Sequence, residues 1–312
     1  MSAAEDEIAL PEPRSDRPVT LMHRAEYALA LLLGAFFRLL GVDAASALAG
    51  GFMRRVGPLI GPITQRGRAN LQLAFPDWSD RQVDAVLRDI WENLGRTAAE
   101  FSHLAAFDPD AGGRAEIVGR EKFDSVTASG KPAIFVSGHF ANWEIMPRLM
   151  HAAGLDYAFV YRAANNPLID ALIIRERAKV MSRRQSPKGK RGGRDLLEAL
   201  KAGVSLAMFV DQKLTGGIPS PLFGRPAMTA PAAARLALKY GAPVIPVELE
   251  RLGGARFRLT VRDALDFTPT GDANADTQAL TDRINLELER MIRARPGQWL
   301  WFHRRWGKNI GG

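Results

Sequence analysis

The sequence predicts an α/β protein: a mainly parallel or mixed central sheet flanked by helices, with an N-terminal hydrophobic membrane-associated helical segment. Three observations support this prediction. Short apolar runs alternate with helical patterns after residue 115, a polar residue follows several of those runs, and a charge-free apolar run stands at residues 27–37. Alternation of this kind is typical of layered α/β domains with a parallel sheet.

The N-terminal part divides into a polar tail and an apolar segment. Residues 1–20 are acid-rich and contain proline, which is typical of disorder, and they lack the basic start of a signal peptide. Residues 21–65 are predicted to form hydrophobic helices. The run at 27–37 is too short to span a membrane, which takes about 20 apolar residues. We therefore expect helices that lie in or dip into the membrane interface. The alternative is two buried helices packed on the domain.

Residues 66–312 are predicted to form the main domain. A short helix at 66–75 is closed by Pro76, and Ser79 and Gln82 have the spacing of a capping box that opens a helix reaching about residue 104. The later pattern predicts strands at 115–119, 132–137, 156–161, 204–210, 243–249 and 256–262. It predicts helices at 120–129, 142–153, 167–181, 192–202, 229–240 and 275–294.

Polar side chains follow three of these strands. His139, Arg162 and Asp211 each come directly after an apolar run. Because sites in parallel sheets form beyond the carboxyl ends of strands, these residues are candidates for one site.

The most informative stretch is Ser137-Gly138-His139-Phe140-Ala141-Asn142-Trp143-Glu144, at a strand-to-helix junction. Within one ideal helix His139 and Glu144 would lie about 140° apart, at about 100° per residue. They can meet only if His139 lies in the turn and Glu144 in the first turns of the helix. A histidine held by a carboxylate is suited to deprotonate a hydroxyl as a general base. A structural, hydrogen-bonding histidine is the alternative.

Composition excludes several chemistries. The chain has no cysteine, which rules out disulfides, cysteine nucleophiles and thiolate metal sites. It has no Gly-x-Ser-x-Gly elbow, Walker loop, Gly-x-Gly-x-x-Gly or His-Glu-x-x-His motif, so no serine hydrolase, nucleotide or zinc-hydrolase chemistry is predicted. No metal site is expected. The remaining histidines, carboxylates and cations suit transfer between two bound substrates.

The net charge of +8 indicates an anionic partner: nucleic acid, a membrane surface, or an acidic protein or substrate. A basic run carries much of it, with a single acid, Glu176, and nine cations: Arg175, Arg177, Lys179, Arg183, Arg184, Lys188, Lys190, Arg191 and Arg194. A solvated helix face normally mixes both signs of charge. Near the C-terminus, the set Trp299, Trp301, Arg304, Arg305, Trp306 and Lys308 predicts an interfacial belt.

His139-x4-Glu144 resembles the His-x4-acid motif of the glycerolipid acyltransferase superfamily. Within Gly-His-Phe-x-Asn-Trp-Glu it resembles the lipid A biosynthesis lauroyl/myristoyl (late) acyltransferases of Gram-negative bacteria. The resemblance runs from about residue 21 to the end, and its order and spacing make it specific. Further matching segments are Tyr161-Arg162-Ala163-Ala164-Asn165-Asn166-Pro167, Arg175, Asp211-Gln212-Lys213, Phe223-Gly224-Arg225-Pro226-Ala227 with Thr229, Ala242-Pro243-Val244-Ile245-Pro246-Val247, and Pro296-Gly297-Gln298-Trp299-Leu300-Trp301-Phe302-His303-Arg304-Arg305-Trp306.

The resemblance implies that residues 66–312 are an acyltransferase domain at the cytoplasmic face of the cell inner membrane. The domain would move an acyl chain from a thioester, usually on acyl carrier protein, to a hydroxyl of an anionic lipid A precursor. His139 would be the base and Glu144 would fix its tautomer. Backbone N–H groups of the 142–153 helix, or Arg162, would stabilise the oxyanion. Neither a metal nor a cofactor is implied, because the thioester is a co-substrate. The substrate-binding candidates are Asn142, Arg162, Arg175, Asp211 and Lys213.

Several alternatives stay open at this point. Asn142 could be purely a helix N-cap, and Asp211 with Lys213 could be a structural ion pair. Actinobacterial mannoside acyltransferases share much of the pattern, so the acceptor could be another glycolipid or a glycerolipid. The segment after Arg175 and the short loop at 214–221 depart from the family pattern, which leaves the acceptor and acyl pockets in doubt. A basic nucleic-acid-binding protein and a catalytically silent membrane scaffold are the remaining alternatives.

Overall fold

The structure is a computed structural model that describes residues 8–12 and 18–307. Among these residues seven strands form a central sheet in the order β1-β9-β8-β2-β5-β3-β4. Its strands are β1 (Ala115–Val118), β2 (Ile134–Ser137), β3 (Tyr157–Tyr161), β4 (Gln185–Pro187), β5 (Ser205–Phe209), β8 (Val244–Gly253) and β9 (Arg256–Val261). Neighbouring strands are parallel except β8 and β9. The predicted mixed α/β sheet is therefore confirmed.

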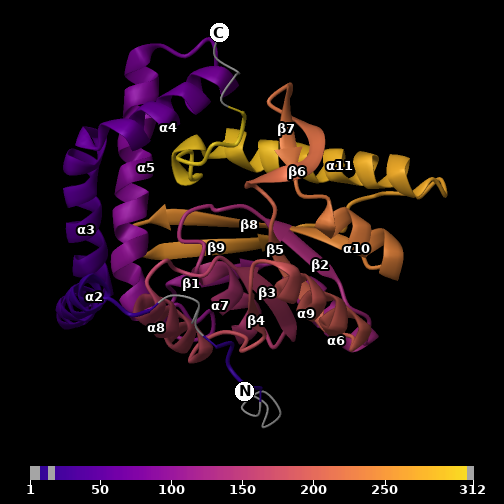
Figure 1. Ribbon diagram of the computed structural model, residues 1–312, viewed down its shortest axis with the longest axis horizontal. Coiled ribbons are helices and arrows are strands. Elements are labelled where there is room, and N and C mark those ends of the chain that lie inside the picture. Colours follow the sequence, from indigo (N-terminus) through magenta and orange to yellow (C-terminus); the bar gives the residue numbers. More distant parts are fainter. Residues whose placement is uncertain (1–7, 13–17, 308–312) are drawn as a thin grey trace.

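Two layers of helices cover the sheet (Figure 1). One hydrophobic cluster packs α6 (Arg120–Ser129), α7 (Ile145–Ala152) and α8 (Pro167–Ala178) on one face. A second packs α9 (Lys190–Lys201), α10 (Ala232–Tyr240) and α11 (Ala273–Ala294) on the other face. The carboxyl ends of β2, β5, β3 and β4 therefore stand in a row between two helical layers, where the sequence predicted the site.

The N-terminal helices stand beside the sheet (Figure 1). They are α2 (Leu21–Leu40), α3 (Val42–Val56), α4 (Gly61–Ala74) and α5 (Asp80–Glu100), with 3-10 turns at Gly57–Leu59, Phe101–Ala106 and, near the C-terminus, Pro296–Gln298. The predicted capping box opens α5, since Ser79 and Gln82 each accept a hydrogen bond from the other's backbone. Gly95 lets α5 approach α3, because a Cβ there would lie 2.4 Å from the Ala49 carbonyl oxygen.

The apolar helix α2 makes an unusual surface. It is 20 residues long and has no buried residue, and its outward side exposes Leu29, Leu32, Phe36 and Leu39. In the part of the chain that the structure describes, none of the helices is both long and apolar enough to cross a membrane. The predicted disordered tail, 1–20, falls largely outside the described residues, and the predicted domain limits stay predictions.

The C-terminal aromatic segment is buried, so the predicted interfacial belt is wrong. Trp299, Trp301 and Trp306 are at most 3 % exposed and pack with α4, α5, α11 and the hairpin of β6 (Lys213–Leu222) and β7 (Arg225–Thr229). Arg305 is fully buried and donates to the Met228 carbonyl and the Thr229 hydroxyl. The residues pack here because large aromatic surfaces gain most from leaving water. Of the other two cations in that set, Arg304 is exposed and Lys308 lies outside the described residues.

Candidate active site

His139 stands in the turn after β2, the central strand of the sheet. The turn is tight: a Cβ on Gly138 would lie 2.9 Å from side-chain carbons of Leu288 and Phe140. Ala141 has φ of 46°, a left-handed conformation that is uncommon outside glycine. Side chains of α5 hold it there, because Asn93 and Thr97 donate to the Ala141 carbonyl oxygen at 2.8 and 3.2 Å. Packing and hydrogen bonds from α5 therefore fix the conformation of the turn that carries His139.

Asp211, from the end of β5, holds the imidazole. The His139 Nδ1 atom lies 2.8 Å from Asp211 Oδ1, and the His139 backbone N–H donates to Oδ2 at 2.8 Å. Trp299 Nε1 donates to Oδ2 as well, at 2.9 Å. Burial by itself would raise the pKa of Asp211, but the His139 charge and the hydrogen bonds from His139 and Trp299 outweigh it and hold this pKa below its usual range. The carboxylate is an acceptor, so the His139 Nδ1–H is the donor, and in the neutral imidazole the lone pair that can accept lies on Nε2.

The Nε2 side of His139 faces a second histidine. The Gln212 amide nitrogen lies 3.4 Å from His139 Nε2 and 3.3 Å from His303 Nε2. Burial, followed by the charge of His139, lowers the pKa of His303 below its ordinary value. His303 is thus kept neutral at neutral pH.

Glu144 is engaged elsewhere, which differs from the expectation that it would fix the His139 tautomer. Both of its oxygens accept from Arg177 of α8, with Oε2 2.7 Å from Nε and Oε1 2.6 Å from Nη2. Helix α7 begins at Ile145, so Glu144 is its N-cap residue and His139 lies in the preceding turn, as the spacing predicted. Among the described residues, the carboxylate that accepts from the His139 ring Nδ1–H is that of Asp211.

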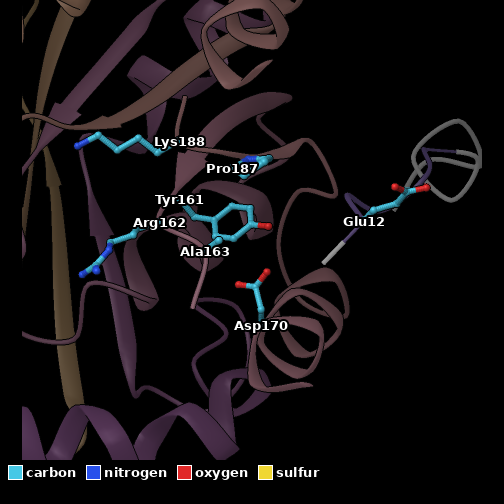
Figure 2. A pocket seen from close by; sticks show the side chains of 7 residues that line it. All are labelled: Glu12, Tyr161, Arg162, Ala163, Asp170, Pro187 and Lys188. Atoms are coloured by element: carbon cyan, nitrogen blue, oxygen red, sulfur yellow. The ribbon is translucent and has the colours of Figure 1, made fainter. Parts of the chain in front are cut away.

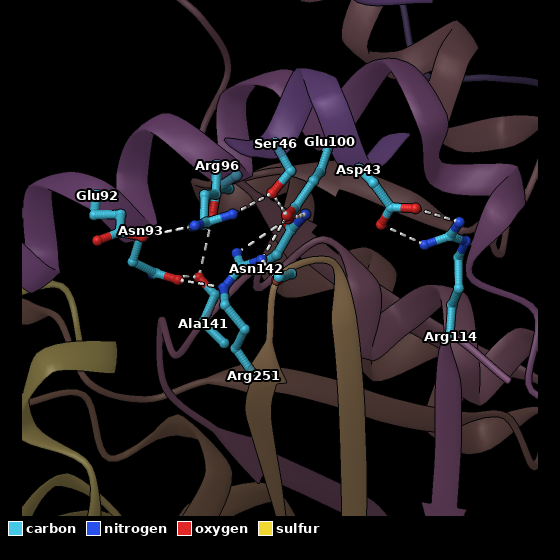
Figure 3. A network of polar contacts seen from close by, with 12 residues as sticks. Asp43, Ser46, Glu92, Asn93, Arg96, Glu100, Arg114, Ala141, Asn142 and Arg251 are labelled. Carbon is cyan, nitrogen blue, oxygen red and sulfur yellow. Dashed lines mark hydrogen bonds and ion pairs between the residues drawn. The ribbon is translucent and has the colours of Figure 1, made fainter. Parts of the chain in front are cut away.

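Asn142 belongs to a buried polar network (Figure 3). Its amide donates to Glu100 at 2.9 Å and its oxygen accepts from the Glu144 N–H at 3.2 Å. Glu100 is fully buried and is also bonded by Ser46 and Arg251. With no exposed surface, Asn142 shapes the turn and is not available to a substrate in this structure.

The other predicted binding residues are dispersed. Arg162 is exposed at the end of β3, and Lys213 is exposed at the start of β6, with no ion pair to Asp211 among the described residues. Arg175 lies against α2, where its guanidinium is 3.5 Å from the Tyr27 hydroxyl. The structure thus brings His139, Asp211 and Arg162 to the carboxyl-end edge of the sheet, whereas Arg175 lies between α8 and α2.

Four residues of the site were not predicted as site residues: Arg177, Gln212, Trp299 and His303. All four stand inside segments quoted for the family resemblance or the basic run, but a motif does not say which of its residues turn inward. No group of three or more His, Asp or Glu side chains in the described ranges is placed to hold a metal ion.

The fold and this site define an α/β enzyme with a carboxylate-supported histidine at the strand ends, and comparison with known proteins identifies its family. The model of bacterial lipid A biosynthesis acyltransferases matches residues 16–308, and the chain belongs to this family. Similar proteins include the Escherichia coli lipid A biosynthesis lauroyltransferase, 29% identical over 247 residues that cover 76% of each chain. The Escherichia coli palmitoleoyltransferase is 26% identical over 261 residues, covering 80% of this chain and 82% of its own. The protein is therefore an enzyme of lipid A biosynthesis that transfers acyl groups.

Proposed function

We propose that the protein transfers a fatty acyl chain from an acyl thioester, with acyl carrier protein as the donor, to a hydroxyl of a lipid A precursor. The observation that supports this most directly is the geometry of His139, whose Nδ1 lies 2.8 Å from the buried Asp211 carboxylate and whose Nε2 points away from it. Family membership supports the lipid A acceptor. A hydroxyl is a weak nucleophile at neutral pH, so a positioned base is what such a transfer needs.

In the proposed reaction His139 Nε2 takes the proton of the acceptor hydroxyl as its oxygen attacks the thioester carbonyl. The new C–O bond gives a tetrahedral oxyanion, which collapses with cleavage of the C–S bond. The imidazolium then returns the proton to the departing thiolate. Asp211 stabilises the imidazolium throughout. We assign this orienting role to Asp211 rather than Glu144, because the Glu144 carboxylate is bonded to Arg177. The reaction as proposed needs no metal or cofactor.

The oxyanion needs hydrogen-bond donors, and several of the expected backbone donors are already bonded within the protein. The N–H groups of Ala141, Glu144 and Ile145 already donate within the protein. The Gln212 amide, beside His139 Nε2, is a donor at the reacting position, and Arg162 is a more distant one. Removing one such donor in other acyl-transfer enzymes costs about 10²–10³ in rate.

We further propose that α2 and α3 attach the enzyme to the cytoplasmic face of the cell inner membrane. The exposed apolar side of α2 supports this, since an apolar surface of this kind is stable only against lipid or another apolar body. A lipid acceptor and a soluble thioester donor can meet only at a membrane surface. Arg24 and Arg55, which are exposed on these helices, would face anionic headgroups.

The test is acyl transfer by detergent-purified protein from a panel of acyl-carrier-protein thioesters to a tetra-acylated lipid A precursor, read by mass spectrometry. We expect a gain of one acyl-chain mass. His139→Ala should lower the rate by about 10²–10⁴, whereas His151→Ala, at the far end of α7, should leave it unchanged. No mass gain with any donor from folded protein would contradict the lipid A assignment and point to mannoside or glycerolipid acceptors.

A further inference from the structure

Four parallel strands end side by side at the site, and each is followed by a polar side chain. His139 follows β2, Asp211 follows β5, Arg162 follows β3 and Lys188 follows β4, in the spatial order of the sheet. Neighbouring strands lie about 4.8 Å apart, so the end of β4 is about 14 Å from the end of β2. The row therefore runs from the base to a cationic position three strands away.

The structure divides the basic run into neutralised and unpaired cations. Arg177 is paired with Glu144, Lys179 with Glu176, and Arg184 with Asp156. Within the described part of the run, the exposed cations without an acid partner in an ion pair are Arg175, Lys188, Lys190, Arg191 and Arg194, and exposed Arg162 at the end of β3 has none either. Four of them belong to the strand end and first turns of α9, which has no acid in its first turn. Unpaired charge is thus gathered at the β3–β4 end of the row.

Arg162 and Lys188 form a matched pair within this group. Tyr161 and Pro187 are register partners of β3 and β4, and the Lys188 N–H donates to the Tyr161 carbonyl oxygen at 2.8 Å. Figure 2 shows both cationic side chains pointing the same way, opposite to the Tyr161 ring. The charge of Arg162 contributes, after burial and the charge of His139, to the low pKa of His303. Arg162 and Lys188 therefore lie together on one side of the ends of β3 and β4.

We infer that Arg162 and Lys188 bind the phosphate of a phosphopantetheine arm, the group that carries the acyl thioester in the donor. This inference rests on the proposed function, since it places the donor of that reaction. With the thioester at His139, the phosphate must lie at the other end of the extended arm. About thirteen bonds separate the thioester sulfur from the phosphorus, which at the reach per bond of an extended chain is about 15 Å. That length matches the distance from β2 to β4.

The cations are suited to this ligand. Two parallel cationic side chains can donate to several oxygens of one phosphate group, and hydrogen bonds between charged groups are the strong ones. Lys190, Arg191 and Arg194 continue the positive surface beyond the pair. On a carrier protein they would face the acidic surface around the attachment serine.

The test measures binding without an acceptor, so that it does not depend on lipid A. The probes are thioether analogues of acyl-phosphopantetheine and of acyl-pantetheine, which lacks the phosphate. We expect the wild-type protein to bind the phosphorylated probe about 10- to 100-fold more tightly, the ratio that a lost charged hydrogen bond gives. The double variant Arg162→Ala/Lys188→Ala should bind both probes equally. Lys201→Ala, at the other end of α9, should keep the wild-type ratio.

The outcomes separate the inference from the proposed function. Binding of neither probe by wild-type protein would contradict a thioester donor, and so the proposed function. Equal binding of both probes by wild type, or an unchanged ratio in the double variant, would overturn the phosphate site alone. Loss of lipid A precursor binding with an unchanged probe ratio would also overturn it and assign the pair to the acceptor.

A second pair of probes tests contact with the carrier protein. The triple variant Lys190→Ala/Arg191→Ala/Arg194→Ala should weaken binding of the thioether on acyl carrier protein and not that of the free acyl-phosphopantetheine thioether. Equal weakening of the two would overturn the carrier contact and leave the phosphate site as inferred.

Discussion

Asp211 is the residue that holds the His139 ring in place, although the two are 72 positions apart. Its carboxylate is fully buried and is bonded by the His139 ring, the His139 backbone and the Trp299 indole. Three donors on one carboxylate leave it ionised and fixed in place. The imidazole thereby has one tautomer and one orientation.

Asp211→Asn should lower kcat by about 10²–10⁴ with little change in KM, because an amide can donate to Nδ1 and so favour the tautomer with its proton on Nε2. The measurement is steady-state acyl transfer, with Glu144→Gln made alongside. If Glu144 rather than Asp211 orients His139, Glu144→Gln will reproduce the kcat loss and Asp211→Asn will not.

At the scale of single residues, part of the candidate site could be predicted from the sequence. His139 could be predicted because a buried strand, a Ser-Gly break and a histidine are local features. The role of Asp211 could not, since pairing of β2 with β5 is decided by the whole sheet. The spacing of His139 and Glu144 showed that the two could meet, yet Arg177 binds the carboxylate, and no local pattern distinguishes that arginine from its neighbours in the basic run.

At the scale of elements, α2 is the helix whose surface most needs a partner. Replacing Leu32 and Leu39 together by Glu should weaken binding to anionic phospholipid vesicles at least about tenfold, because each burial of a leucine is worth about 1.5–3 kcal/mol when complete. Vesicle co-sedimentation measures this. Leu286→Glu, an exposed leucine on α11, is the matched control and should bind as wild type. Unchanged binding in the α2 variant would remove the case for membrane attachment through this helix.

The α3–α5 contact makes a second prediction. A methyl group at Gly95 would lie 2.7 Å from Met53 side-chain carbons and against the Ala49 carbonyl, in a tightly packed helix pair. Gly95→Ala should therefore lower the free energy of unfolding by about 1–3 kcal/mol. Chemical denaturation checks it. Gly193→Ala in α9, where a Cβ meets nothing within 4 Å, should be neutral or stabilising by up to about 1 kcal/mol. Equal effects of the two substitutions would contradict the packing argument.

The elements predicted from periodicity are confirmed within a few residues, and those missed have a physical reason. Strand β6 contains Gly216, Gly217, Pro219 and Pro221, residues that disfavour strands except at edges and bulges. It pairs with β7 outside the main sheet, so that it needs no continuous ladder. Strand β4 has only three residues and no apolar run. These strands form because neighbouring strands pair with them, and a local sequence pattern does not reveal such tertiary pairing.

For the whole molecule, the site is where separate parts of the chain meet: the β2 turn, the end of β5, α5 beneath the turn and the C-terminal aromatic segment. The aromatic cluster joins the N-terminal helices to α11 and the hairpin. The prediction of an interfacial belt was wrong because composition alone does not distinguish the two cases. Tryptophan and arginine occur together both at membrane surfaces and in buried contacts between elements, as here.

Stability should depend on pH through His303. Its pKa is lowered from 6.5 on folding, so the unfolded chain takes up the proton first as pH falls. The stabilisation is complete above about pH 6.5 and is lost as pH falls from there through the lower folded-state pKa. Urea unfolding between about pH 7.5 and pH 5 should show this loss, and His303→Gln should reduce the slope. The carboxylates with lowered pKa, such as Asp211, contribute only at more acidic pH. An identical slope in His303→Gln would exclude His303 as the source.

The hydrogen bond from Trp299 to Asp211 joins residues 88 positions apart, and this separation has a consequence in time. A ribosome adds about 5–20 residues per second, so Asp211 is made on the order of 4 to 18 seconds before its indole partner. Throughout that interval the β2 turn and the end of β5 can leave the ribosome while the histidine lacks its complete support. A growing chain thus lacks the complete set of hydrogen bonds to Asp211 until the aromatic segment is made, long after α2 and α3 have left the ribosome.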